Sequence, residues 1–303
     1  MDIGMVGMGR MGGAMAQRIR KGGHRVVAYD RDPDTRSAGK GWDIDVAESL
    51  EQLVEMLPKP RIVWVMVPSG NPTEGTVSAL AEVLETGDTL IEGGNSNYND
   101  SMRRGDALQH RGINMIDAGV SGGIWGLAEG YCLMVGGEPD VVAAADPVLR
   151  SLAPSPDKGY AHVGPLGAGH FTKMVHNGIE YGLMQAYAEG FELMKAKEAF
   201  SLDVAQIAEL WRHGSVVRSW LLDLTANALR EDSDLADIAP WVEDSGEGRW
   251  TVEESVELAV PIPVISMALQ ARFRSRDTSQ FAFRLLAAMR NQFGGHAVRR
   301  RQG

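Results

Sequence analysis

The sequence contains one cysteine, no long apolar run and no excess of basic residues, and each absence argues against a class of protein. The lone Cys132 cannot form an internal disulfide, and its place in the apolar run 131–135 predicts a buried structural thiol rather than a nucleophile. No apolar stretch reaches the length of a membrane span, so we expect no membrane partner. Lysine and arginine number 30 against 40 aspartates and glutamates, and the net charge of -10 argues against a nucleic-acid partner.

Two further absences concern metals and targeting. The seven histidines show no paired spacing typical of metal ligands, so we expect no metal site. The first residues already have the pattern of a strand, without the basic and apolar segments of a secretory signal. Together with the single cysteine, this pattern predicts a cytoplasmic location.

The order of apolar patterns predicts two domains of different architecture. Strand-like runs cover residues 3–6, 25–29, 61–67, 89–91, 114–116 and 131–135. The helical patterns between them cover residues 11–21, 46–56, 73–84 and 98–110. After about residue 164 the patterns are helical, at 168–197, 203–212, 217–230, 252–258 and 263–293. We therefore predict an α/β Rossmann-type domain of residues 1–163, with a parallel sheet between two helical layers, and an all-α domain of residues 164–303.

A glycine motif follows the first predicted strand and opens the first predicted helix. In Gly7-x-Gly9-x-x-Gly12 the first glycine permits a tight turn, the second admits a pyrophosphate to the backbone, and the third lets helix and strand pack closely. The helix N-terminus presents unpaired N–H groups and a positive dipole to phosphates. The motif predicts a dinucleotide site made by Gly7, Met8, Gly9, Arg10, Met11 and Gly12, although a turn that binds nothing would have the same glycines.

Asp30 ends the second predicted strand, 18 residues after Gly12. A carboxylate there can accept hydrogen bonds from a ribose diol and would repel a 2′-phosphate. Arg31 follows directly and can stack on adenine or bind a phosphate, whereas Asp32 adds a second negative charge. On balance we predict NAD rather than NADP.

Three further loops follow strands, where open parallel sheets bind ligands. Val67-Pro68-Ser69-Gly70 follows the third strand, and the loop 92–96, which includes Asn95, follows the fourth. We expect both to close over the cofactor. In the loop 117–123, Ser121, Gly122 and Gly123 offer a hydroxyl and backbone N–H groups to a carboxylate.

A polar stripe lies on the predicted helix 168–197. Lys173, Asn177 and Glu180 stand at positions i, i+4 and i+7, so they share one face. A buried polar stripe is costly unless its members are paired, which favours a functional site over an exposed charged face.

Four segments of the chain resemble a known family. DAGVSGG from Asp117 and GPLGAGHFTKMVHNGIEYGLMQ from Gly164 resemble the β-hydroxyacid dehydrogenases, and more narrowly the short-chain form of the 6-phosphogluconate dehydrogenase family. EGGNS from Glu92 and RNQFGGH from Arg290 resemble the same family. The resemblance covers nearly the whole chain, and the segment around Lys173 is its most specific part.

This resemblance implies a reaction and a set of roles. Lys173 would be the general base and Glu180 the general acid in oxidative decarboxylation of 6-phosphogluconate to ribulose 5-phosphate, with reduction of NAD or, less favoured, NADP. The sugar acid would be held by Asn95, Ser121, Gly122, Gly123, His176 and Asn177, and its phosphate by Tyr181 and Arg272. Arg290 and His296 match tail residues that the family lends to a neighbouring subunit, which implies a homo-oligomer with shared active sites.

Two departures from the family and two alternative functions remain. The C-terminal half is shorter than in long-chain members, and the family's phosphate-binding lysine has no counterpart in the loop 244–249, where Ser245 stands near its place. A non-decarboxylating enzyme of the 3-hydroxyisobutyrate type would need Lys173 but neither Glu180 nor Tyr181. A catalytically silent nucleotide sensor would need the glycine loop only.

Overall fold

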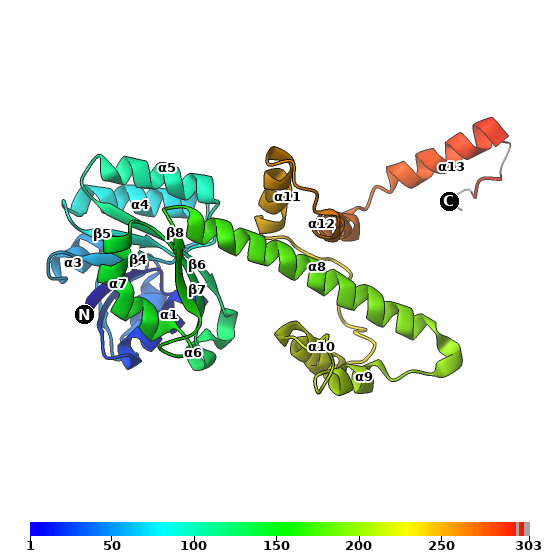
Figure 1. Cartoon of the computed structure of the whole chain (residues 1–303), viewed down its shortest axis with the longest axis horizontal. Coiled ribbons are helices and arrows are strands. Elements are labelled where there is room, and N and C mark those ends of the chain that lie inside the picture. The colour runs from blue at the N-terminus through cyan, green and yellow to red at the C-terminus, as the bar shows by residue number, and fades with distance from the viewer. Residues whose placement is uncertain (295–296, 300–303) are drawn as a thin grey trace. The chain divides into compact units, whose positions relative to one another are not determined.

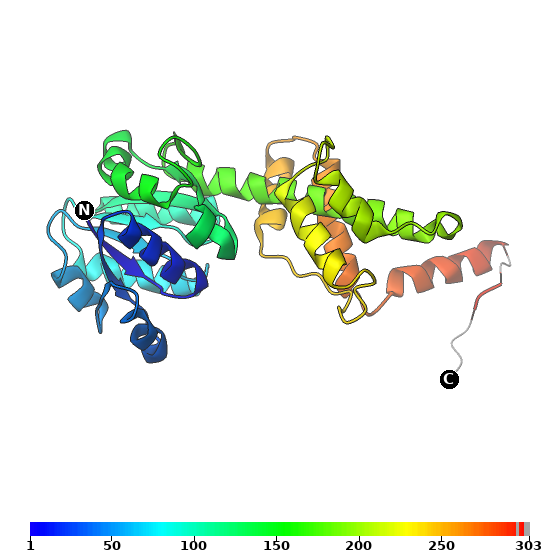
Figure 2. The same cartoon turned by 90° about the horizontal axis from the view of Figure 1, so that it is seen from below.

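The computed structural model describes residues 1–294 and 297–299, which divide between Asn177 and Gly178 into two compact units (Figures 1 and 2). The first unit is an α/β sandwich and the second is helical, which confirms the predicted fold class. The two units divide inside a long helix, and the domain boundary at 163/164 stays a prediction. Within the described ranges, no helix combines the length and apolar character needed to cross a bilayer.

The first unit is built on an eight-stranded sheet of order β3-β2-β1-β4-β5-β6-β7-β8. Its strands are β1 (Asp2–Val6), β2 (Arg25–Tyr29), β3 (Asp45–Val46), β4 (Ile62–Val65), β5 (Thr89–Glu92), β6 (Asn114–Ser121), β7 (Cys132–Gly136) and β8 (Tyr160–Gly164). Strands β1 to β6 are mutually parallel, whereas β7 pairs with β6 antiparallel and with β8 parallel. The carboxyl ends of β1, β2, β4, β5 and β6 therefore meet at one edge.

Helices cover both faces of this sheet (Figure 1). One layer contains α1 (Arg10–Lys21) and α7 (Pro139–Leu152), and the other contains α3 (Leu50–Glu55), α4 (Asn71–Val83) and α5 (Tyr98–Gln109). Successive strand residues point to opposite layers: Met5 packs in the α1 layer and Val6 in the α4 layer. Because both faces are buried, the central strands are continuous apolar runs. The short segments α2 (Pro33–Gly39), η1 (Gly123–Trp125) and α6 (Gly126–Glu129) complete the unit.

The helix α8 (Ala168–Ala196) continues into the second unit, which also contains other helical elements. These are η2 (Glu198–Phe200), α9 (Val204–Trp211), α10 (Trp220–Glu231), α11 (Glu247–Glu257), α12 (Pro263–Arg276) and α13 (Phe281–Gly294). Phe191 of α8 packs with Ala208 of α9 and Leu222 of α10 in one core. Tyr181 of α8 packs with Leu269 of α12 in a second, smaller core.

Several element predictions were wrong in detail. The predicted helix 46–56 is the short strand β3 followed by α3, because the Ser49 side chain accepts a hydrogen bond from Gln52 N–H at 3.2 Å and begins the helix there. The predicted helix 263–293 is two helices, since the Asp277 carboxylate accepts hydrogen bonds from the N–H groups of Ser279 and Gln280 and closes a turn. α2, α7 and β8 were not predicted.

The segment 117–123 and Cys132 also differ from the prediction, for one reason. Asp117–Ser121 is not a loop but the second half of β6, paired antiparallel with β7. Cys132 lies opposite Ser121 at the end of this strand pair where residues 122–131 connect the strands, and its side chain is exposed rather than buried. The alternation of strand residues instead directs Leu133 and Val135 into the core.

Candidate active site

The glycine loop has the geometry of a phosphate cradle. Gly7 adopts φ of +94°, and a Cβ there would lie 2.3 Å from the Met66 carbonyl oxygen. A Cβ at Gly12 would lie 1.9 Å from the Gly7 carbonyl oxygen, so α1 packs against the strand at backbone distance. A Cβ at Gly9 would meet no atom within 4 Å. Gly9 is the N-cap of α1, and no side chain caps this end of the helix at that position. These features fit a dinucleotide pyrophosphate over Gly9.

Within this loop Met8 is buried, Arg10 is exposed and Met11 is half-buried. The loop is held to the next strand by Asp30. Asp30 Oδ2 accepts a hydrogen bond from Met8 N–H at 2.7 Å, and Oδ1 accepts one from Asp32 N–H at 2.9 Å. Arg31, beside it, is exposed.

Asp32 itself is engaged in the α2 cap. Its carboxylate accepts hydrogen bonds from Thr35 Oγ1 at 2.7 Å and from Asp34 N–H at 3.2 Å. These hydrogen bonds, that from Thr35 first, hold the pKa of Asp32 below its ordinary value. Two carboxylates therefore stand at the carboxyl end of β2, and Asp30 is the one in contact with the glycine loop.

The loops after β4 and β5 pack against each other. A Cβ at Gly94 would lie 2.8 Å from the Val67 carbonyl oxygen, so only glycine allows this approach. Thr73 Oγ1 donates to the Pro68 carbonyl at 2.8 Å and fixes the first loop, in which Ser69 is exposed. Asn95 is half-buried in the second loop.

A buried ion pair anchors the loop that carries Asn95. Glu92 ends β5 with its carboxylate 0% exposed, and Arg104 of α5 donates to it at 2.7 Å from a side chain that is 3% exposed. The same guanidinium bonds Glu74 of α4 at 2.9 Å. A pair buried this deeply fixes where β5 ends and the loop begins.

Lys173 lies on the part of α8 that packs over β6. Its Nζ donates to Asn177 Oδ1 at 2.7 Å, and His176 Nδ1 lies 2.9 Å from the same oxygen. The three side chains are half-buried. A Cβ at Gly119 of β6 would lie 2.4 Å from Lys173 Cβ, so the lysine stem rests on the strand two residues before Ser121.

The strand β6 ends in a turn that requires glycine. Gly122 and Gly123 adopt φ of +136° and +52°, conformations that side chains disfavour. Ser121 and Gly122 are half-buried and Gly123 is exposed. The predicted residues at 7–12, 30–31, 67–69, 95 and 121–123 each lie at or shortly after the end of a parallel strand, and the carboxyl ends of these strands lie at one edge of the sheet.

Two buried residues beside Lys173 were given no role by sequence analysis. Asp117 of β6 accepts hydrogen bonds from Gly167 N–H at 2.7 Å and His170 N–H at 2.6 Å. His170 Nδ1 lies 2.7 Å from Ser101 Oγ of α5. The sequence signal was present, since both residues lie in the family-like segments, but neither contact is local.

The second unit holds a separate polar group around Tyr181. The Arg272 guanidinium lies 3.6 Å from the centre of the Tyr181 ring and donates to the Glu243 carbonyl at 2.7 Å. The Tyr181 hydroxyl accepts a hydrogen bond from Ser245 N–H at 3.2 Å. This is the position where the family's lysine has no counterpart.

Arginines near this group are paired with a carboxylate. Arg249 donates to Asp244 at 2.7 Å and Arg276 donates to it at 2.6 Å. The hydrogen bond from Arg249 is the main reason that the pKa of Asp244 falls to about 2. Arg272 does not pair with Asp244. Among the described residues, its guanidinium is the cation that lies over the Tyr181 ring.

The remaining predicted residues are less constrained. Glu180 is half-buried on α8, and Arg290 is exposed on α13. His296 lies outside the described residues. Among the residues that the structure describes, no group of three or more His, Cys, Asp or Glu side chains could hold a metal ion.

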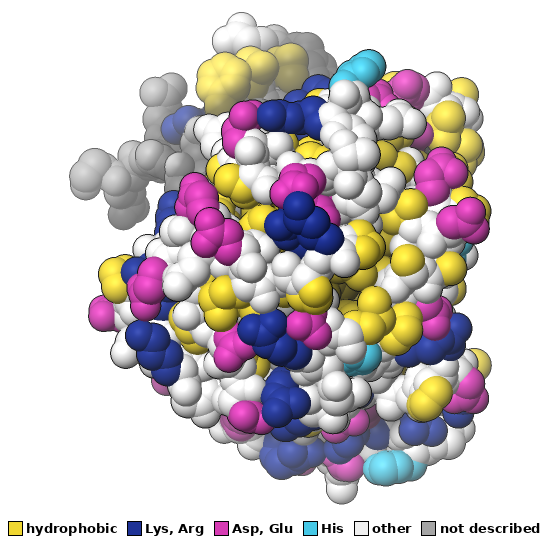
Figure 3. Space-filling model, turned by 90° about the vertical axis from the view of Figure 1, so that its left-hand side faces the viewer, with side chains coloured by type: hydrophobic (Ala, Val, Ile, Leu, Met, Phe, Trp, Pro, Cys, Tyr) yellow, Lys and Arg dark blue, Asp and Glu magenta, His cyan; other side chains and the backbone are white. Residues whose placement is uncertain are grey.

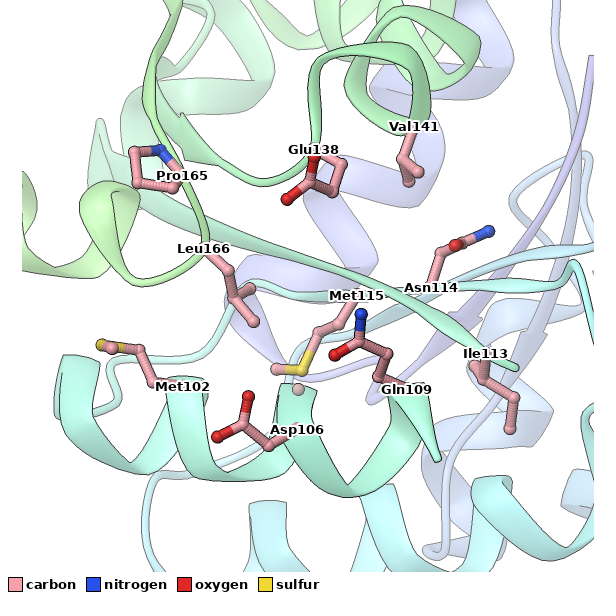
Figure 4. Close-up of a pocket in the computed structure, with 11 residues that line it drawn as sticks. Met102, Asp106, Gln109, Ile113, Asn114, Met115, Glu138, Val141, Pro165 and Leu166 are labelled. Atoms are coloured by element: carbon pink, nitrogen blue, oxygen red, sulfur yellow. The ribbon is translucent and has the colours of Figure 1, made fainter. Parts of the chain in front are cut away.

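One face of the molecule carries mixed charges, and one pocket is lined by none of the candidate residues. In Figure 3, Lys and Arg side chains are interspersed with Asp and Glu side chains on the face turned to the viewer. A pocket of about 250 Å³ lies between Asp106 and Gln109 of α5 and Glu138 and Val141 at the start of α7, with Met115 of β6 between them (Figure 4). Its lining shares no residue with the candidate set.

Comparison with known proteins agrees with this geometry. Residues 2–164 match the family described as the NAD binding domain of 6-phosphogluconate dehydrogenase, and residues 169–283 match the 6-phosphogluconate dehydrogenase C-terminal domain. The NAD(+)-dependent, decarboxylating 6-phosphogluconate dehydrogenase of Haloferax volcanii is 41% identical over 99% of both chains. The enzyme of the same name from Bacillus subtilis is 37% identical over 90% of this chain and 61% of its own.

A solved structure extends the likeness to three dimensions. The 6-phosphogluconate dehydrogenase of Plasmodium falciparum, 28% identical, superposes with a TM-score of 0.83 over 100% of this chain and 67% of its own. The chain is thus similar to a relative of its own length, from Haloferax, and to two longer relatives, of which it covers 61% and 67%. It belongs to the 6-phosphogluconate dehydrogenase family, with a nicotinamide-dinucleotide-binding domain at residues 2–164.

Proposed function

We propose that the protein oxidatively decarboxylates 6-phosphogluconate to ribulose 5-phosphate and carbon dioxide, with NAD as the preferred cofactor. The observation that carries the proposal is the placement of Lys173, which is paired with Asn177 and rests on Gly119 beside the Ser121 turn. The names of the Haloferax and Bacillus relatives, NAD-dependent and decarboxylating, support the cofactor and the product.

Lys173 is the proposed general base. A neutral lysine amine takes the proton of the 3-hydroxyl, and bound NAD supplies the acceptor for the hydride that leaves carbon 3. Asn177 orients the lysine nitrogen through the 2.7 Å hydrogen bond. The protonated lysine then donates a hydrogen bond to the new ketone, so the carboxylate can leave as carbon dioxide. The ketone takes up the electron pair as an enediol, and the step therefore needs no metal.

Glu180 is the proposed general acid. It follows Lys173 by seven residues on the continuous helix α8. At about 1.5 Å per residue the two positions are separated by about 10 Å along the helix axis. Lys173 can thus serve the oxidised carbon, while Glu180 delivers a proton to the carbon that lost the carboxylate, which becomes carbon 1 of ribulose 5-phosphate.

Arg272 and Tyr181 are the proposed phosphate ligands. Arg272 is a cation stacked on the Tyr181 ring, and the Tyr181 oxygen, which accepts the Ser245 N–H, can donate its own hydrogen to the phosphate. Arg249 and Arg276 are paired with Asp244, and Arg276 also with Glu243 at 3.3 Å, so we assign the phosphate charge to Arg272. The half-buried Asn95, Ser121 and His176 would hold the sugar acid in the same proposal.

The NAD preference rests on Asp30. Its carboxylate is held beside the glycine loop by Met8 N–H, where it can accept hydrogen bonds from a ribose diol and would repel a 2′-phosphate. We also infer a homo-oligomer in which Arg290 and His296 complete a neighbour's site. A cytoplasmic location stays a prediction.

The decisive assay supplies purified protein with 6-phosphogluconate and either cofactor, and follows reduced nicotinamide by absorbance and carbon dioxide by release. Lys173→Met should abolish both signals, because the base is lost. Lys195→Met is the matched control, since Lys195 is on the same helix but pairs with Asp234 on the surface. Reduced nicotinamide without carbon dioxide would favour a non-decarboxylating β-hydroxyacid dehydrogenase, and cofactor binding without turnover would favour a nucleotide sensor.

A further inference from the structure

A buried carboxylate holds the first turn of α8. The side chain of Asp117 is 0% exposed, and its two oxygens accept the Gly167 and His170 N–H groups at 2.7 and 2.6 Å. The first N–H groups of a helix have no partner within the helix, and a capping oxygen normally comes from a neighbouring residue in sequence. Here it comes from a strand 50 residues earlier, so the cap also fixes the helix to the sheet.

A second contact fixes the same turn to α5. The imidazole of His170 is buried, and its Nδ1 lies 2.7 Å from Ser101 Oγ. The ring of the next residue, Phe171, meets the Tyr98 ring edge-on at 5.3 Å between centroids. Both α5 residues lie in the first turn of that helix, shortly after the loop that carries Asn95.

Glycines set the distance between α8 and the strands. A Cβ at Gly169 of α8 would lie 2.5 Å from the Met134 carbonyl oxygen and 2.6 Å from that of Asp117. A Cβ at Gly136 of β7 would lie 2.3 Å from Asp117 Oδ1. The helix therefore touches β6 and β7 at backbone distance, with little room to shift.

From these contacts we infer that Asp117 is a positioning residue for Lys173. Lys173 follows His170 by one helical turn, and its stem rests on Gly119, two residues along β6 from Asp117. The cap thus links the strand that ends in the Ser121 turn with the helix that carries the base. The inference rests on the proposed role of Lys173. A misplacement of about 1 Å can cost roughly 100-fold in rate, so a rigid link of this kind matters for turnover.

The test is Asp117→Asn. An amide keeps the shape but offers one acceptor oxygen in place of two, so one of the two N–H groups loses its partner. We expect kcat to fall by roughly 10- to 100-fold. The KM for NAD should stay unchanged, because the glycine loop is not touched. The deuterium isotope effect with substrate labelled at carbon 3 should rise, because a displaced base slows the chemical step relative to product release.

Asp88→Asn is the matched control. Asp88 is also buried and accepts backbone hydrogen bonds from Arg61 and Glu85 N–H, but at the amino end of β5, where it pairs with the Arg61 guanidinium at 3.0 Å as well. It should lower the thermal midpoint and leave kcat and the isotope effect of the folded protein unchanged. If Asp117→Asn behaves in the same way, Asp117 is only structural and the inference is overturned.

A second pair of variants covers the case in which Asp117→Asn does not fold. Gly119→Ala would place a Cβ 2.4 Å from Lys173 Cβ and 2.7 Å from the Gly169 carbonyl, and should lower kcat and raise the isotope effect. Gly75→Ala on α4, where a Cβ meets open space, should change neither. Normal kcat in folded Gly119→Ala or Asp117→Asn overturns the inference. A wild-type protein without activity on 6-phosphogluconate overturns the proposed function instead.

Discussion

Arg104→Met should destabilise the N-terminal unit far more than a surface substitution. The change leaves the Glu92 carboxylate, 0% exposed, without the guanidinium that lies 2.7 Å away. Removing one member of a buried ion pair costs about 3–5 kcal/mol, because the other charge stays buried and uncompensated. In a unit of this size each kcal/mol corresponds to about 2–4 °C, so the thermal midpoint should fall by roughly 6–20 °C. Calorimetry of the purified protein measures it.

The neighbouring arginine provides the control. Arg103 lies on the same helix and pairs with the same Glu74 at 2.7 Å, but its side chain is 56% exposed. Arg103→Met should therefore cost about 0.2–1 kcal/mol, the range of exposed pairs. If the two variants lower the midpoint equally, the reasoning from burial is refuted. Because the ion pair precedes the loop of Asn95, Arg104→Met should also raise the KM for NAD.

The remaining predictions concern the cofactor, the subunits and the acid. Asp30→Ser should narrow or reverse the preference for NAD by relieving repulsion of a 2′-phosphate; a wild-type kcat/KM that is higher with NADP would contradict the assignment. Arg290→Ala and Lys173→Ala proteins should each be nearly inactive but recover part of the activity when mixed and reassembled, and the absence of recovery in reassembled oligomers would count against shared sites. Glu180→Gln should lower turnover by roughly 10²–10⁴-fold, together with proton exchange at carbon 1 of ribulose 5-phosphate. Near-normal values of both would remove Glu180 from the acid role.

Local sequence patterns were sufficient to predict features that depend on residues a few positions apart. The spacing of Gly7, Gly9 and Gly12 predicted the tight turn and the close packing of α1, because each glycine answers a steric demand within a few residues. The i, i+4 spacing likewise predicted that Lys173 and Asn177 share a face, and their side chains are hydrogen-bonded. The break between α12 and α13 was local as well, in the turn formed by Asp277, but the surrounding helical periodicity obscured it.

The tertiary structure decided what depends on distant pairing. β7 pairs antiparallel with β6, a strand that precedes it in the chain. Because of this pairing, Asp117–Ser121 is part of a strand, and Cys132 is exposed at the end of the pair. The cap of α8 joins Asp117 to Gly167, 50 positions apart, through hydrogen bonds that no sequence window contains. Residue type shows that a carboxylate can cap a helix. The helix that Asp117 caps is determined by the pairing of the strands and by the glycines that allow the backbones to lie close together.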